Sequence, residues 1–135
     1  MRDYARQQTA LLLNRLSVVL DRAARDCDEH SIHDLRVAMR RLSRCLRVFA
    51  AFYPEGSWKK IRRRIAGLMA AAGAVRDCDI AIELVGRAGV ARRSAMVTQL
   101  SAQRRKAGRD LLVEVRHWKH RDFPKRWRHR LELEP

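Results

Sequence analysis

The amino-acid sequence predicts an all-α protein, an antiparallel helical bundle of about four to six helices. Apolar residues recur at spacings of three and four, which places them on one face of an α-helix. No stretch alternates apolar and polar residues with the period of two that indicates a β-strand. Prolines and several glycines lie between the periodic stretches, where helices should end. The length suits one domain, which we expect to span residues 1–135.

The first two helices follow from the periodicity of the N-terminal part of the chain. Residues from about 4 to 25 predict one amphipathic helix, and residues 26–30 form a polar connection. We expect Ser31 to be the N-cap of a second helix that runs to about Phe52. The segment 53–56 contains a proline and a glycine and should stop that helix.

The middle of the chain predicts a longer helix followed by a short one. We expect Ser57 to cap the third helix and Gly73 to end or weaken it. Either Asp77 or Asp79 would then cap a short fourth helix at about residues 80–85.

The C-terminal part predicts one long helix and one short helix. Gly86 and Gly89 mark the end of the fourth helix, and a fifth should run from about residue 92 to 118. The Asp-Phe-Pro sequence at 122–124 is typical of a helix start. Residues 119–135 are therefore either a short basic helix packed on the bundle or a flexible basic tail.

The net charge of +15, from 30 basic and 15 acidic residues, predicts an acidic partner. The charge is uneven, because residues 1–30 are neutral whereas 31–76 carry +9 and 77–135 carry +6. Twenty-five of the 30 cations are arginine, whose forked guanidinium suits phosphate oxygens. A genome rich in G and C also raises arginine content, so the placement of the arginines decides between these explanations.

The second predicted helix separates its apolar and basic residues onto two arcs. The apolar arc, about 120° wide, holds Ile32, Leu35, Ala38, Met39, Leu42, Leu46 and Phe49. The basic arc, about 80° wide, holds His33, Arg36, Arg40, Arg44 and Arg47. Like charges at this spacing repel each other, so the basic arc favours an extended anion lying alongside it. A solvated face without a ligand is the alternative.

Two further arginines lie near the predicted core. Arg104 falls within the inward stripe of the fifth helix, so it should pair with Asp77 or Asp79 or face a hydrated, anion-lined interior. Arg76 precedes Asp77 at an expected helix start, where backbone N–H groups add to an anion site.

Three segments in the correct order resemble the CHAD family, the conserved histidine α-helical domain. HSIHDLRVAMRRLSRCLRVFAAFYP is similar to the family's His/Arg helix, and the matching positions are His33, Arg36, Val37, Arg40, Arg41, Leu42, Phe49 and Pro54. GAVRDCD, at residues 73–79, resembles its Arg-Asp turn, and LSAQRRKAGRDLLVEV resembles its later Arg-rich helix. The resemblance implies an all-helical domain that binds inorganic polyphosphate through a basic surface and has no catalysis of its own.

The candidate polyphosphate ligands combine the basic arc with the motif positions and flanking cations. They are His33, Arg36, Arg40, Arg41, Arg44, Arg47, Lys59, Lys60, Arg63, Arg76, Arg104 and Arg105. Ser43 stands where the family usually has Arg or Lys, which weakens the transfer to Arg44. The chain also carries one His/Arg helix, whereas the family domain has two similar halves. We therefore expect either a fragment or a half-domain that forms a homodimer to restore the missing half.

Two other kinds of function are weaker alternatives. The same charge would attract nucleic acid, although few aromatic residues interleave with the basic arc. The pairs His30/His33 and His117/His120 have a spacing that can bind a metal, but no third ligand is obvious nearby. No catalytic motif or cofactor-binding motif occurs, so we expect neither an enzyme nor a cofactor.

Cysteine and hydropathy patterns bear on the cellular location. Cys27, Cys45 and Cys78 are odd in number and widely spaced, which fits small apolar residues and not a disulfide framework. No apolar run is long enough to span a membrane, and the N-terminus has no signal-peptide pattern. We expect a soluble, cytoplasmic protein that does not contact membranes.

Overall fold

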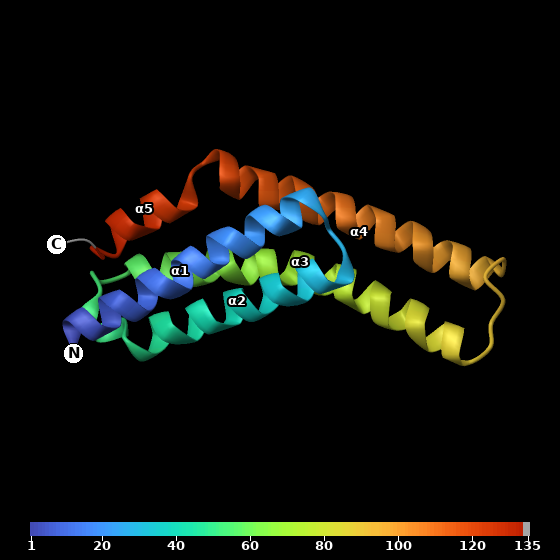
Figure 1. Cartoon of the computed structure of the whole chain (residues 1–135), viewed down its shortest axis with the longest axis horizontal. Coiled ribbons are helices and arrows are strands. Elements are labelled where there is room, and N and C mark those ends of the chain that lie inside the picture. The colour runs from blue at the N-terminus through green and yellow to red at the C-terminus, as the bar shows by residue number, and fades with distance from the viewer. Residues whose placement is uncertain (134–135) are drawn as a thin grey trace.

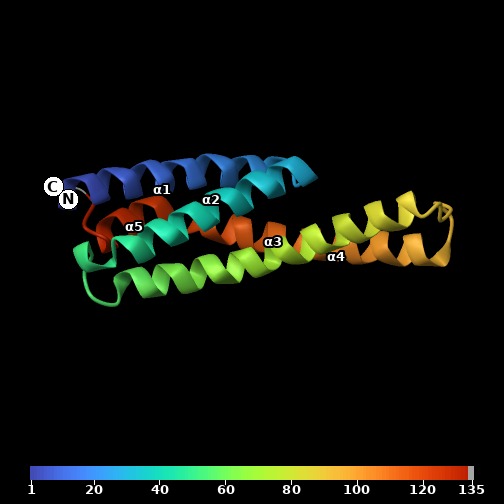
Figure 2. The same ribbon diagram turned by 90° about the horizontal axis from the view of Figure 1, so that it is seen from below.

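The computed structural model describes residues 1–133 and confirms the predicted all-α bundle. Its helices are α1 (Arg2–Arg25), α2 (Glu29–Val48), α3 (Ser57–Arg87), α4 (Ala95–His120) and α5 (Phe123–Arg130), with a 3-10 turn, η1 (Ala50–Phe52). No β-strand occurs within residues 1–133. Figures 1 and 2 show α1 and α2 as an antiparallel pair beside the longer α3–α4 hairpin, with α5 covering the end of the bundle that α4 does not reach.

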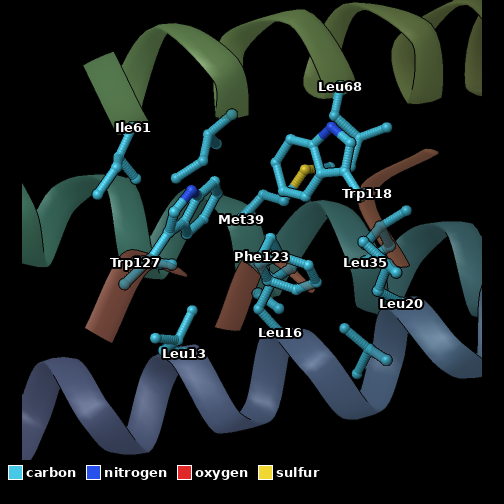
Figure 3. Packing of buried hydrophobic residues seen from close by; sticks show 14 of the residues in the cluster. Leu13, Leu16, Leu20, Leu35, Met39, Ile61, Leu68, Trp118, Phe123 and Trp127 are labelled. Carbon is cyan, nitrogen blue, oxygen red and sulfur yellow. The ribbon is translucent and has the colours of Figure 1, made fainter. Parts of the chain in front are cut away.

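The core lies where all five helices meet. Figure 3 shows its central side chains, which include Leu13, Leu16, Leu20, Leu35, Met39, Ile61, Leu68, Trp118, Phe123 and Trp127. The two indole rings lie 5.0 Å apart, edge to face, and both contact the phenyl ring. The predicted apolar arc of α2 is confirmed, because all seven of its residues belong to the core or pack against it. Burial of these side chains provides the main free energy for packing the helices.

The residues that cap α2 and α3 differ from those expected. Asp28 caps α2, and its carboxylate accepts a hydrogen bond from the Ser31 backbone N–H at 2.7 Å. This hydrogen bonding lowers the pKa of Asp28. Gly56 precedes α3 with a φ of +82°, and Ser57 is the first helical residue, donating its hydroxyl to the Pro54 carbonyl. The predictions of Ser31 and Ser57 as N-caps are therefore wrong.

The expected third and fourth helices are one continuous helix. α3 runs for 31 residues and passes through Gly73, Asp77 and Asp79 without a break, so the predicted end at Gly73 is wrong. Neither aspartate caps a helix start. Ser94 instead caps the next helix, α4, by accepting the Val97 N–H at 3.2 Å.

The long α3 and α4 extend beyond α1 and α2 and form a two-helix arm (Figures 1 and 2). We define the arm as residues 76–107. None of its residues is buried, whereas α3 before it and α4 after it both contribute to the core. Within the arm the two helices pack on each other, and at its base Arg76 and Arg104 contact the bundle.

The base of the arm is fastened to the bundle by Arg104. Its Nε lies 3.2 Å from Asp79 Oδ1, and its Nη2 donates to the Cys27 carbonyl at 2.9 Å. The expected pairing of Arg104 with Asp77 or Asp79 is thus confirmed, with Asp79 as the partner. The second carboxylate oxygen of Asp79 is buried without a hydrogen-bond partner in the described part of the chain. Asp79 therefore depends on Arg104 for compensation of its charge.

The three cysteines are free thiols, as expected of small apolar residues. Cys45 is buried, whereas Cys27 and Cys78 are half-buried. Burial raises the pKa of the Cys27 thiol, which favours its neutral form.

The C-terminal segment packs on the bundle up to residue 133. Phe123, Trp127, Leu131 and Leu133 are buried, which corresponds to the packed alternative for the basic C-terminal segment. Residues 134 and 135 lie outside the described residues.

We expect Trp127→Ala to lower the free energy of unfolding by about 3–5 kcal/mol, because it removes the largest fully buried side chain of the core. Urea denaturation followed by circular dichroism measures this change. His129→Ala removes an exposed side chain from the same helix and should change stability by less than about 0.5 kcal/mol. Equal effects of the two substitutions would contradict the packing of α5 on the bundle.

Arg104→Leu should destabilise the protein by about 2–4 kcal/mol, because Asp79 would keep its charge without a partner. The neighbouring Arg105 is exposed, so Arg105→Leu serves as the matched control. Thermal unfolding of both variants gives the comparison. A loss no larger than that of the control would show that the ion pair does not fasten the arm.

Candidate anion-binding groove

A solvent-open cavity of about 1020 Å³ lies between α2 and α3, and we call it the α2/α3 groove. Six of its thirteen lining residues are cations, three from each helix. They are Arg40, Arg44 and Arg47 from α2, and Lys59, Arg62 and Arg63 from α3. No carboxylate lines the groove. The groove therefore presents positive charge from two facing helices to one volume of solvent.

The floor of the groove is apolar and belongs partly to the core. It is formed by Met39, Ile65, Ala66, Met69 and Ala70. Met39 and Ile65 are almost fully buried, so the backbone beneath the cations is held by core packing. Rigid helices present the charged side chains, which limits the ordering that a bound anion would require.

One side-chain hydrogen bond crosses from α3 to α2 within the groove. The Nε of Arg62 donates to the Ser43 hydroxyl at 3.1 Å. Ser43 thus accepts a hydrogen bond from a guanidinium of the facing helix. Close by, the ammonium of Lys59 lies 5.6 Å from the centre of the Trp58 ring. Both contacts orient cations along the α3 rim.

The groove cations are not neutralised by nearby acids. None of the six forms an ion pair within 4.0 Å among residues 1–133. Other basic residues on the same bundle do have such partners, as Arg22 with Asp34 and Lys119 with Asp21 show. The positive potential of the groove is thus left for a ligand or counterions.

The structure brings five of the twelve candidate ligands together in this groove. These are Arg40, Arg44, Arg47, Lys59 and Arg63. Three more lie on α2 outside the groove lining. His33 and Arg41 are exposed, whereas Arg36 is half-buried and its Nε has no hydrogen-bond partner in the described chain. His33 and Arg36 extend the basic arc from the groove toward the start of α2.

The remaining four candidates lie apart from the groove lining. Arg76 donates to Glu29 at 3.0 Å and Arg104 is held by Asp79, so both are already paired with acids. Arg105 is exposed on α4, which does not line the groove. Lys60 lines a separate hollow of about 520 Å³ together with Arg130.

Arg62 and a second cluster of arginines were not among the ligands predicted from the sequence. Arg62 was visible in the basic run at residues 59–64, but its orientation depends on how α3 crosses α2. The second cluster lies where α3 meets the C-terminal helix and contains Arg64, Arg121, Arg126 and Arg130. Partial dehydration lowers the pKa of Arg126, and repulsion from the other three adds to the effect. No periodicity argument within one helix could have found this cluster.

Neither histidine pair forms a metal site in the described structure. His30 lies 3.4 Å from Asp34, and residues 1–133 contain no group of three or more potential metal ligands.

Among the same residues, no helix combines the length and hydrophobicity that a membrane span requires.

Comparisons with known proteins identify the family. No curated protein and no solved structure matches the chain. A family model, described as the CHAD domain, matches residues 7–135 and so includes both helices of the groove. The match covers nearly the whole sequence, and the chain therefore belongs to the CHAD domain family.

Proposed function

We propose that this protein is a binding module for inorganic polyphosphate, without catalytic activity, and that the α2/α3 groove is its binding site. CHAD domains bind polyphosphate in general. The observation that carries the proposal is a groove with three cations on each rim and no carboxylate in its lining. This arrangement suits an anion whose charge repeats along its length.

The chemistry of the rims suits phosphate oxygens. Each guanidinium can donate two parallel hydrogen bonds to non-bridging oxygens, and Lys59 adds a compact charge. The unpartnered Nε of Arg36 and the exposed His33 lie on the same arc of α2. A chain longer than the groove can thus continue along α2 toward its N-terminus.

We also propose a homodimer, because the sequence carries a single His/Arg helix where the family domain carries two. This proposal concerns assembly and does not depend on polyphosphate binding. A second copy would supply a second His/Arg helix.

Replacing Arg40 and Arg44 together by alanine should weaken binding to long-chain polyphosphate about 10- to 100-fold. Two charge-assisted contacts are lost, so the slope of log K against log salt should also become shallower by about 1–1.5. Fluorescence titration at several salt concentrations measures both quantities, with circular dichroism to check the fold.

The matched control for that variant is Arg92→Ala/Arg93→Ala. It removes the same charge from an exposed loop between α3 and α4, away from the groove. We expect the control to weaken binding less than about threefold, through the long-range field alone. If the two double variants lose equal affinity, net charge and not the groove binds the anion.

Competition separates polyphosphate binding from nucleic-acid binding. At moderate salt, we expect long-chain polyphosphate to displace duplex DNA of equal phosphate count, because a flexible chain can enter the groove between two rims. Trp58 is the one aromatic residue in the groove lining, which offers little stacking to single-stranded bases. Stronger binding of either nucleic acid than of polyphosphate would overturn the proposed ligand.

A further inference from the structure

The solvent side of α3 carries an apolar strip that continues past the bundle onto the arm. Residues 65–75 contain no polar or charged side chain, although one third of the whole sequence is charged. Ile65, Leu68, Ala72 and Val75 are buried, so the rest of this segment faces outward or toward the groove.

We define the α3 strip by its spacing of three and four residues on that outward side. Its members are Ala66, Met69, Ala70, Gly73, Asp77, Ile80 and Leu84. They fall on an arc about 100° wide, so they form one continuous surface along the helix. Ile80 and Leu84 are 38% and 59% exposed, so the strip presents two large apolar side chains to solvent on one face of the arm.

Charge is segregated along α3. Its first eight residues, 57–64, contain five cations and no acid, whereas residues 77–84 contain three acids and no cation. Two α3 helices side by side in opposite directions would place the basic part of each beside the acidic part of the other. A parallel arrangement would place like charges together.

We propose that the α3 strip is the surface through which two copies of this chain pair, with their α3 helices antiparallel and Gly73 near the two-fold axis. The inference rests on the homodimer proposed above and not on polyphosphate binding. Small residues at 66, 70 and 73 allow the two helices to approach closely.

This register places Ile80 opposite an apolar residue and Arg62 opposite an acid, whereas Asp77 lies opposite Met69 of the second copy. Ala66 and Ile80 each lie seven residues from Gly73, so they meet across the axis. Arg62 lies eleven residues before Gly73 and Glu83 lies ten residues after it, both on the same side of the strip. Their distances from Gly73 along the helix agree within about 1.5 Å, so Arg62 of one copy lies beside Glu83 of the other. The stem of Arg62 can also cover the partner copy of Leu84.

A second copy also gives the arm a partner. No arm residue is buried in one chain, and in the pair the acidic part of each α3 arm helix lies against the basic half of the partner helix. Ala66, Met69 and Ala70 of the strip also line the α2/α3 groove, beside the exposed side chains of Arg40 and Arg44. Pairing through the strip therefore covers part of the groove floor.

The first test compares two leucine substitutions at equally exposed sites. Leu84→Asp places a charge on the strip, whereas Leu11→Asp places it on α1, where the side chain is 61% exposed. Sedimentation equilibrium should show a dimer dissociation constant about 10- to 100-fold higher for Leu84→Asp, because each dimer contains the change twice. The Leu11→Asp control should stay within about threefold of the unchanged protein.

The second test uses the open space at two helical glycines. A Cβ at Gly73 or at Gly67 meets no atom within 4 Å, so cysteine fits at either position. Near the two-fold axis, Gly73→Cys should form a disulfide with its own copy under mild oxidation. Gly67 lies on another side of α3, so Gly67→Cys should not, and both variants carry the same native cysteines.

The outcomes separate the assembly from its surface. A chain that is monomeric at micromolar concentrations overturns both the homodimer and the α3 strip. A stable dimer that tolerates Leu84→Asp, or that cross-links equally at both glycine positions, overturns the strip and leaves the homodimer standing. Because the strip and the groove share Ala66, Met69 and Ala70, polyphosphate titration of Arg40→Ala/Arg44→Ala is carried out well below the dimer dissociation constant, where its result does not depend on pairing.

Discussion

The apolar contact between α2 and α3 is the interaction on which the groove and its charge depend. Six cations on two facing helices repel each other by about 0.5 kcal/mol per pair at about 8 Å in water, and salt reduces this further. Each fully buried side chain beneath them, such as Leu42 of α2 or Ile65 of α3, contributes about 1.5–3 kcal/mol. The core therefore holds the cations together without a bound anion, so the groove is formed by the packing of the chain alone.

The continuity of α3 shows why local signals misjudged this helix. A glycine inside a helix costs about 1 kcal/mol relative to alanine, which favours a break at Gly73 when the sequence is considered alone. In the bundle, α4 packs along α3 on both sides of that position, and Arg104 compensates Asp79 in the middle of the helix. Tertiary contacts thus outweigh a local preference of this size. The same reasoning applies to Ser31, which lost the capping position because Asp28 allows α2 to begin earlier.

The sequence predicted the groove cations that follow from the periodicity of α2. It missed the cation whose position depends on how α2 and α3 cross. The basic arc of α2 follows from periodicity alone, and Arg40, Arg44 and Arg47 do line the groove. Arg62 enters the groove because α3 crosses α2 at Ser43, a relation that no single-helix pattern contains. Arg76 was predicted near the core at a helix start, but it lies in the middle of α3, where Glu29, at the start of another helix, accepts its guanidinium. Ion pairs between distant segments are therefore the main reason why the predicted ligands and the groove lining differ.

The two halves of α3 contribute differently to the groove and to the proposed pairing surface. A helix that ended at Gly73 would keep all three groove cations of α3, because they lie within its first seven residues. It would lose the acidic segment and both large apolar residues of the strip, which lie on the arm. The second half of α3 is thus unnecessary for forming the groove, yet it exposes apolar surface that a solitary domain has reason to avoid. The proposed pairing of two copies would cover this surface, and its segregated charge favours an antiparallel arrangement of the two α3 helices.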